Sequence, residues 1–266
     1  MKKKRVKKRT LGLFVLLYSL LLIIGSTYAW VTMADQRVNK MEVKRLEILL
    51  TGNEQNEIIT PALSVKKDVA IRNDGTSQAL VRISLSEILY SFEIDTTDQT
   101  GNGHILTQKQ ASSQPVDVTQ SETWQVGETY QVTPESYWIG KTRTDNPIFQ
   151  WPQTTRPSEF QSALILDMPQ VTTVQPAPED LGETYWLYYC DYFYYSKPLR
   201  PGEWTTPLVH RLQVSPSLEN RQKGSLYQLK AEGEAYSASK AAISESPGWN
   251  LGTNNPVFTM LKEKVD

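Results

Sequence analysis

Apolar and polar residues alternate with a period of two along several short segments, the pattern of strands with one buried face. The clearest segments are Ser64–Arg72 and Ala79–Leu85. Between them, Asn73-Asp74-Gly75 supplies residues that tolerate the left-handed backbone of a tight turn. The pattern predicts a β-hairpin with these inward-facing side chains: Val65, Val69, Ile71, Ala79, Val81, Ile83 and Leu85.

Further strands are predicted at Val43–Leu50, Ala163–Met168, Leu208–Val214 and Leu226–Ala235. In the first of these, Leu46, Ile48 and Leu50 fall on one face. Ala163–Met168 is an apolar run interrupted only by Asp167, and we expect a strand covered on both faces. The chain also contains 13 tyrosines, seven tryptophans, six phenylalanines, 15 prolines and 14 glycines, a composition that favours strands and turns over helices.

A few short helices are expected. Ser84-Leu85-Ser86-Glu87 has the spacing of a capping box, and Ile88, Leu89 and Phe92 could form the apolar stripe of a short helix. Ala235–Ile243 is a second candidate, and Phe258–Leu261 a third.

Between Asp95 and Pro157 the alternation gives way to Thr, Gln, Ser, Gly and Pro. Aromatic residues nevertheless recur there: Trp124, Tyr130, Tyr137, Trp138, Phe149 and Trp151. Disordered segments rarely carry so many aromatics. We therefore expect an irregular insertion that packs back on the core.

The most aromatic stretch is Thr184–Tyr195, with eight rings: Tyr185, Trp186, Tyr188, Tyr189, Tyr192, Phe193, Tyr194 and Tyr195. The favoured interpretation is a central pair of strands whose rings fill the core of a sandwich. The alternative is an exposed binding platform, since exposed aromatics mark interfaces.

The N-terminus has the order of a secretory signal. A basic block ends at Arg9, Leu11–Gly25 is mostly apolar, and small residues follow. Cleavage is expected between Ala29 and Trp30, and signal peptidase is the partner during export. The alternative is an uncleaved anchor over Leu11–Val31, since a span needs about 20 residues. No other membrane contact is expected.

The expected organisation is a signal peptide (1–29), an N-terminal segment (30–42), a β-sandwich domain (43–252, with the insertion at 95–157) and a C-terminal tail (253–266). Of the 28 lysines and arginines, seven lie before residue 30, whereas all 29 acidic residues lie after it. The remainder therefore has 21 basic against 29 acidic residues, a net charge of −8. An acidic protein is a poor partner for nucleic acid.

Few residues suggest chemistry. The single cysteine, Cys190, allows no intramolecular disulfide, and burial as an inert small side chain is favoured over an intermolecular bridge. The two histidines, His104 and His210, are far apart in sequence, and neither belongs to an H-E-x-x-H motif. No nucleophile elbow or phosphate loop is present. We therefore expect no enzyme activity and no catalytic, cofactor-binding or metal-ligating residue.

Several motifs resemble the SipW-dependent exported biofilm matrix proteins, in particular the BsaA-type branch of the TasA-like family. They are the Thr-Tyr-Ala-Trp cut site at 27–30, the segment from Pro61 through Asn73-Asp74-Gly75 to Leu80-Val81-Arg82-Ile83, the run Tyr192–Leu208, and the pair Gly224–Tyr227 and Ala231–Ala235. The resemblance covers the two ends of the chain well and 95–157 poorly.

This resemblance implies an antiparallel jelly-roll-like β-sandwich secreted by a Gram-positive cell to the matrix or the cell surface. It implies a structural subunit or accessory of a matrix fibre, whose partner is itself or a related subunit. Assembly would donate the segment after the cut as a strand to a neighbour. The apolar residues of that donor are Trp30, Val31, Met33, Val38 and Met41. The alternative is a cell-surface glycan-binding module that uses the tyrosine-rich stretch; a secreted hydrolase is a more distant one.

Overall fold

The computed structural model describes residues 45–52, 56–97, 104–147 and 158–265. The chain divides into two units, Met1–Lys44 and Arg45–Asp266, and the described residues all belong to the second. The expected cleavage site, Ala29 and Trp30, lies outside the described residues. So do the other donor-strand residues, Val31, Met33, Val38 and Met41.

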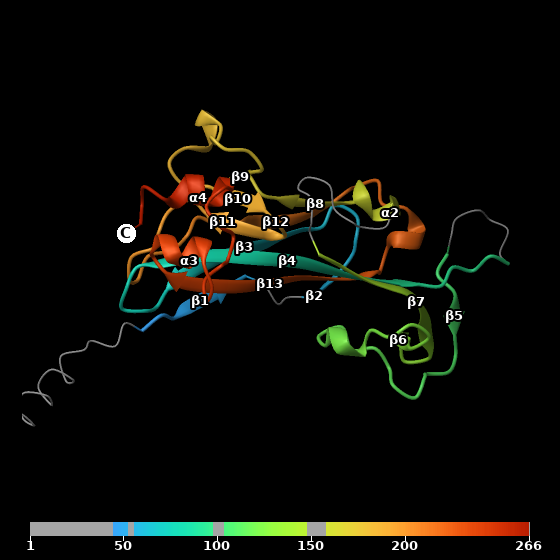
Figure 1. Ribbon diagram of the computed structural model, residues 1–266. Helices are drawn as coiled ribbons and strands as arrows, with labels where there is room; N and C mark the ends of the chain where they lie inside the picture. The colour runs from blue at the N-terminus through green and yellow to red at the C-terminus, as the bar shows by residue number, and fades with distance from the viewer. Residues whose placement is uncertain (1–44, 53–55, 98–103, 148–157, 266) are drawn as a thin grey trace, which may run out of the picture. The chain divides into compact units, whose positions relative to one another are not determined.

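Two β-sheets form the second unit (Figure 1). The small sheet has the order β1-β3-β12-β8, with bounds Ile48–Thr51, Ser64–Asn73, Val209–Val214 and Leu164–Asp167. The large sheet has the order β2-β13-β4-β11-β10-β9, with bounds Asn56–Ile58, Leu226–Ser237, Ala79–Phe92, Tyr192–Tyr195, Trp186–Tyr189 and Val171–Thr172. All these pairings are antiparallel except that of β9 with β10. The expected all-β sandwich is confirmed.

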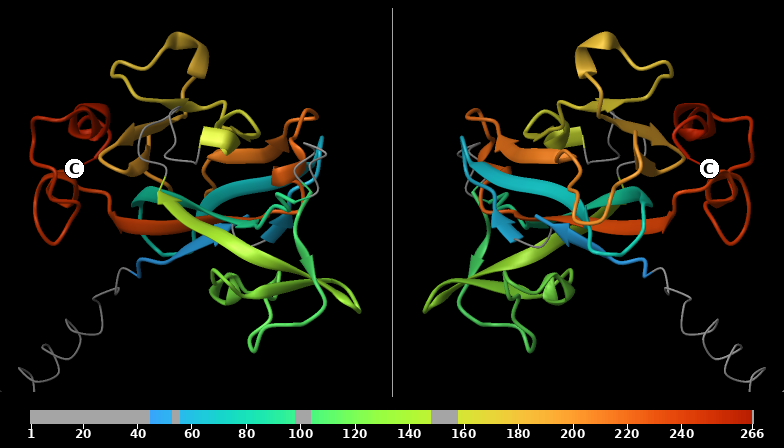
Figure 2. Two further views of the ribbon diagram at one scale, coloured as in Figure 1. Left: turned by 90° about the vertical axis from the view of Figure 1, so that its right-hand side faces the viewer. Right: turned by 90° about the vertical axis from the view of Figure 1, so that its left-hand side faces the viewer.

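The two sheets face each other across the main hydrophobic core (Figure 2). Alternate residues of β4 supply one side of it, from Ala79 to Leu89, and Val69 and Ile71 of β3 supply the other. The inward faces predicted for both strands are confirmed, except that Val65 is only half-buried.

The predicted hairpin between these strands is wrong. β3 pairs with β1 and β12, whereas β4 pairs with β13, β11 and β7, so the Asn73-Asp74-Gly75 turn carries the chain from one sheet to the other. Alternation identifies the buried face of a strand but carries no information about its pairing partner.

The helix predicted around Ser84–Phe92 is also wrong, because β4 continues as a strand to Phe92. Both faces of this part of β4 are covered. Leu89 faces the main core, while Ile88, Tyr90 and Phe92 on the outer face belong to a second cluster. A strand buried on both faces loses its alternation and cannot be told from a helix by periodicity.

The 95–157 insertion covers that second cluster and is here called the insertion cap. It contains β5 (Thr107–Gln108), a 3-10 turn at Ser121–Thr123, β6 (Thr129–Thr133) and β7 (Ser136–Pro147), and β7 pairs with β4. Trp124 is fully buried, and Tyr130 and Trp138 pack on Phe92 with ring centroids 5.8 and 5.3 Å away. The expectation that its aromatics pack back on the core is confirmed for these three residues. Tyr137 is half-buried and lies outside this cluster, and Phe149 and Trp151 lie outside the described residues.

The C-terminal residues cover the other end of the same outer face and form the helical cap. It contains α3 (Lys240–Ser244) and α4 (Pro256–Leu261), which begin at the N-caps Ser239 and Asn255. Both helices fall where the sequence predicts helical segments, and their buried residues pack on Leu80 of β4. The remaining helical elements of the described residues are α2 (Ser158–Gln161) and 3-10 turns at Glu179–Leu181 and Asn220–Gln222.

Candidate functional site

The outer edge of β1 has no strand partner among the described residues. The Asp74 N–H donates to the Glu47 carbonyl at 2.8 Å, which sets the alternation of the β1–β3 ladder. Residues 47, 49 and 51 therefore point their backbone groups toward β3. The backbone N–H and C=O groups of Ile48 and Leu50 point toward the open edge.

The edge of β13 next to it is also open over part of its length. β2 pairs with β13 only at Leu226–Gln228, whereas β4 pairs with it as far as Ser237. Because the Ala238 N–H donates to the Gln78 carbonyl at 3.1 Å, the even-numbered residues of β13 bond to β4. Gly233 and Ala235 therefore direct their backbone groups away from β4, where no described strand pairs with them.

These two edges lie against each other at one side of the sandwich, as β1 and β13 do in Figures 1 and 2. Ile48 packs over Gly233 so closely that a Cβ on Gly233 would lie 3.3 Å from Ile48 Cδ1. Ile48, Leu50 and Ala235 are half-buried and pack against the main core. We call this region, with Leu46 at 39% exposure, the seam. It combines unpaired backbone groups with apolar side chains, the two requirements for adding a strand.

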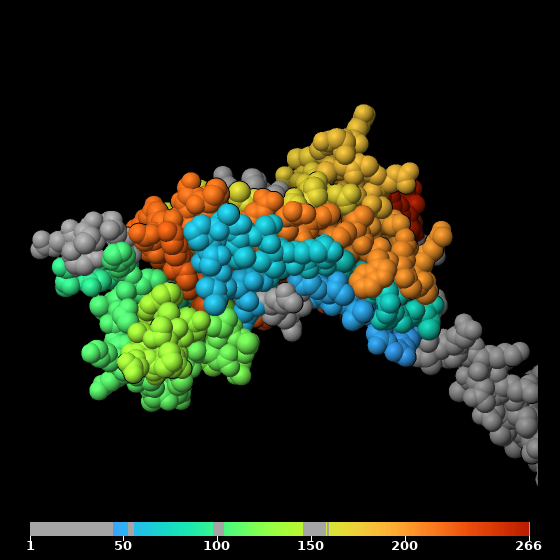
Figure 3. Space-filling view, turned by 180° about the vertical axis from the view of Figure 1, so that it is seen from behind, coloured from blue at the N-terminus to red at the C-terminus, as the bar shows by residue number. Residues whose placement is uncertain are grey.

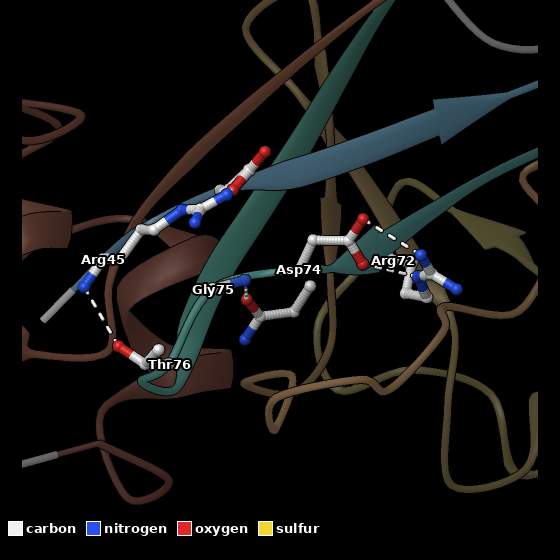
Figure 4. A network of polar contacts seen from close by, with 7 residues as sticks. Arg45, Arg72, Asp74, Gly75 and Thr76 are labelled. Carbon is white, nitrogen blue, oxygen red and sulfur yellow. Dashed lines mark hydrogen bonds and ion pairs between the residues drawn. The ribbon is translucent and has the colours of Figure 1, made fainter.

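A polar clasp fixes the chain where it enters β1 (Figure 4). The Thr76 N–H donates to the Arg45 carbonyl at 2.8 Å, and the Arg45 N–H donates to Thr76 Oγ1 at 3.0 Å. The turn itself is held by Asn73, whose Oδ1 accepts from the Gly75 N–H at 2.9 Å. Gly75 is required by close approach, since a Cβ there would lie 2.3 Å from the Arg45 carbonyl oxygen.

Arg72 and Asp74 reinforce the clasp through two hydrogen bonds, Nε to Oδ1 at 2.5 Å and Nη2 to Oδ2 at 3.0 Å. The hydrogen bond from Arg72 holds the pKa of the Asp74 carboxyl below its usual range. The clasp therefore holds Arg45, the first described residue, directly before the seam residues Leu46 and Ile48.

The outer face of the small sheet contrasts with the seam. Figure 3 views the molecule from behind and shows this face, on which β1, β3 and β12 form one surface. Its side chains are mostly polar, including the exposed Lys66, Arg211 and Gln213. Trp204 lies at its margin, 43% exposed, with the Arg72 guanidinium 5.3 Å from its ring centroid.

The aromatic stretch does not form an exposed platform. β10 and β11 are neighbouring strands of the large sheet, and five of their rings are buried: Trp186, Tyr188, Phe193, Tyr194 and Tyr195. Tyr185, directly before β10, is buried as well. Tyr189 and Tyr192 are half-buried, and Tyr192 stacks on the Arg82 guanidinium at 3.6 Å. The interpretation as core strands is confirmed.

The prediction that Cys190 is buried is wrong. Cys190 and Asp191 form the two-residue turn between β10 and β11, both with positive φ (45° and 69°), and Cys190 is exposed. The apolar neighbours that suggested burial belong to the strands, while the thiol lies at the turn where they end.

The two histidines lie on different elements: His104 is exposed in the insertion, and His210 is half-buried in β12. In the described part of the chain, no three His, Cys, Asp or Glu residues are grouped in a way that could hold a metal ion. No helix there has the length and hydropathy needed to cross a membrane.

Sequence reasoning missed the seam. Gly233 was the available signal, since a glycine inside an alternating strand often marks close backbone approach. The seam itself depends on β1 and β13, which are about 180 residues apart, so local patterns could not reveal it.

No family model matches this chain, and neither a curated protein nor a solved structure does.

Proposed function

We propose that this chain is a secreted structural subunit of an extracellular fibre, built by adding a strand from one subunit to the seam of the next. The observation that supports the proposal is the seam, where two open strand edges flank half-buried core side chains. The proposed donor is Trp30–Met41 of a neighbouring copy or of a related TasA-like matrix subunit. The proposal assigns no catalytic residue.

Strand addition at the seam would satisfy both its unpaired backbone groups and its exposed apolar side chains. It would pair the backbone groups of Gly233 and Ala235 or of Ile48 and Leu50, and it would cover the apolar side chains beside them. The proposed donor has apolar residues for this purpose, and its C-terminal end lies only three residues before the clasp.

The alternative of a glycan-binding module with a tyrosine platform loses the feature that suggested it, because most of those rings are buried. The alternative for the N-terminal segment is that it pairs within its own subunit. Deleting the segment would then unfold the subunit, whereas deleting a donor strand would leave it folded.

The donor is tested by deleting residues 30–40 from the chain that begins at Trp30. We expect a folded, soluble monomer that no longer forms filaments under electron microscopy. A synthetic peptide of residues 30–41 should cap the filaments of the undeleted protein. Unfolding of the deleted protein would mean that the segment completes its own sandwich, and unchanged filaments would refute strand donation.

The acceptor is tested by proline substitution at two neighbouring positions of β13. Ala235→Pro removes an N–H that points to the open edge, so the monomer should fold and fail to assemble. Glu234→Pro removes an N–H that bonds to β4 and the carboxylate that pairs with Arg82, and should destabilise the fold by about 1–3 kcal/mol or more. Normal filaments from a folded Ala235→Pro protein would exclude the β13 edge as the acceptor.

Export is tested by N-terminal sequencing of protein recovered from the medium. We expect a mature chain beginning at Trp30, because Thr27 and Ala29 suit the positions before the cut. Recovery of only full-length protein in the membrane fraction would establish the anchored alternative.

A further inference from the structure

A polar pocket of about 440 Å³ opens on the outer face of the large sheet, away from the seam. Its floor comes from β4, β13 and β7, through Ser86, Gln228 and Asp145 among others. Its wall is the Thr119–Glu122 segment of the insertion cap. The pocket therefore exists because the insertion cap covers one end of β4 and stops short of the middle of the strand.

Arg143 of β7 joins the floor to the wall. Its guanidinium binds both oxygens of Asp145, Nε to Oδ1 at 2.9 Å and Nη2 to Oδ2 at 3.1 Å. Its Nη1 donates to the Ser121 carbonyl at 2.6 Å and to the Trp124 carbonyl at 3.3 Å. The hydrogen bond to Asp145 raises the pKa of Arg143 above its usual value. The wall is thus held in place before any ligand arrives.

Two polar side chains on the floor remain available. Neither the Ser86 hydroxyl nor the Gln228 amide has a hydrogen-bond partner in the part of the chain that the structure describes. Together they offer hydrogen-bond donors and acceptors within one pocket. Because both lie on rigid strands of one sheet, their positions are fixed relative to each other.

The charges around the pocket compensate one another. Arg143 and Lys230 carry positive charge, and Glu122 and Asp145 carry negative charge. Arg143 is neutralised by Asp145, and Lys230 lies 2.8 Å from Glu232. With Glu232 included, two cations face three carboxylates, so a phosphate or a nucleic acid would meet no net positive charge.

The apolar lining is limited to Ile88, whose side chain is largely buried under the insertion cap. A lipid or an aromatic ligand would bury little apolar surface here, so it would gain little binding free energy. A neutral molecule with several hydroxyl groups would instead meet donors, acceptors and carboxylates. The volume lies within the range of about 300–1,000 Å³ that is usual for small-molecule sites.

We propose that this pocket binds a neutral saccharide unit, with Ser86 and Gln228 as direct hydrogen-bonding residues and Arg143 as the residue that positions the wall. The proposal is independent of strand addition, because the pocket and the seam share no residue. Each can fail without the other.

The test follows the side-chain amide signals of Gln228 by NMR, in the secreted protein as isolated. The probes are the methyl glycosides of glucose and galactose, N-acetylglucosamine, and the corresponding disaccharides; glucuronate and glucosamine serve as charged comparators. At least one neutral probe should shift the Gln228 amide signals saturably. No saturable shift at tens of millimolar, or stronger binding of a charged comparator or of a short peptide, would overturn the proposal.

Two tryptophan substitutions on one face of β4 provide the matched comparison. Ser86→Trp fills the pocket and should weaken binding by about tenfold or more, because a ring replaces the space and the hydroxyl. Ser84→Trp lies two residues away on the same face, outside the pocket lining, and should leave binding unchanged.

A second pair covers the case in which Ser86→Trp does not fold. Gln228→Ala removes an amide from the pocket and should weaken binding by about tenfold. Gln213→Ala removes an exposed amide from the small sheet and should not change it. Full binding by Gln228→Ala, followed on the ligand signals, refutes this pocket as the site.

Discussion

Apolar side chains are covered on the outer face of the large sheet and left partly exposed at the seam. On the outer face, the two caps bury the apolar ends of β4, one with aromatic rings from the insertion and the other with two short helices. At the seam, Ile48, Leu50 and Ala235 belong to the margin of the main core, yet no described segment covers them. Among the described residues, the insertion and the C-terminal segment cover the outer face, whereas the seam stays half-covered. Under the proposed function, the seam would receive a partner strand, whereas the caps serve the stability of the subunit.

The comparison predicts that cap residues control stability, and the largest effect is expected at Trp124. Its side chain is fully buried against Tyr90, and its Nε1 donates to the Asp117 carbonyl at 2.8 Å. Trp124→Ala should lower the free energy of unfolding by about 3–5 kcal/mol, measured by urea denaturation. Val126→Ala, at a position 61% exposed, is the control and should change it little. A loss below about 1 kcal/mol would mean that the insertion cap is not coupled to the core.

The second prediction concerns Gly140 in β7, which packs on the phenol of Tyr90. An added Cβ would lie 1.8 Å from Tyr90 Oη, which donates to the Gln125 carbonyl at 2.7 Å. Gly140→Ala should therefore cost about 2–3 kcal/mol in the same assay. The cost should be smaller in a Tyr90→Phe background, where the hydroxyl is absent. Equal costs in both backgrounds would show that the hydroxyl is not the obstacle.

A smaller effect on the helical cap should appear at alkaline pH. Burial raises the pKa of Tyr194 to about 12, while a tyrosine in the unfolded chain titrates near 10. The raised pKa means that the folded state holds the phenol proton more tightly, so this contribution is complete below pH 10 and is lost as the pH rises from 10 to 12. By pH 11 the loss is about 1.4 kcal/mol. Denaturation curves at pH 7 and pH 11 should show a smaller decrease for Tyr194→Phe, and an identical decrease would contradict the assignment.

The smallest effect on stability is expected at the seam. Leu46→Ser, at 39% exposure, should change the free energy of unfolding by less than about 0.5 kcal/mol and should nevertheless reduce filament formation. Val132→Ser on the insertion cap is the matched control, since Val132 has the same 39% exposure and lies away from the seam. Equal assembly by both variants would remove the distinction between capped and open apolar surface.

Local sequence patterns identified most of the elements. The inward faces of β3 and β4, the core strands β10 and β11, and the helical segments near 240 and 258 were all predictable, because each depends on neighbouring residues. Errors arose where tertiary contacts decide. Tyr90 and Phe92 face the insertion cap, whose fully buried Trp124 lies more than 30 residues later, so their part of β4 resembled a helix. Cys190 is placed at the surface by a two-residue turn whose positive φ values no apolar pattern encodes.

For the candidate site, the sequence suggested only a donor segment, which lies outside the described residues and stays a prediction. Trp30–Met41 was identified by its place after the expected cut, while the acceptor edges of β1 and β13 come together only in the folded sandwich. The role of Asn73-Asp74-Gly75 was also hidden. The turn was expected to join two strands of one sheet, and its backbone instead holds the residues that lead into β1.

The clasp has a mechanical consequence. Any pull transmitted along residues 1–44 enters the sandwich at Arg45, where bonds from Thr76 and Asp74 hold Arg45 and Glu47 side by side with the turn. From this point β1 pairs with β3, and the hydrogen bonds between the two strands lie across the direction of the pull. Tension along β1 is therefore shared among all these hydrogen bonds and does not break them one at a time. Gly75 is what permits this shared anchorage, since a methyl group there would separate the turn from Arg45. The rate of forced unfolding should therefore depend more on this glycine than its small contribution to the core would indicate.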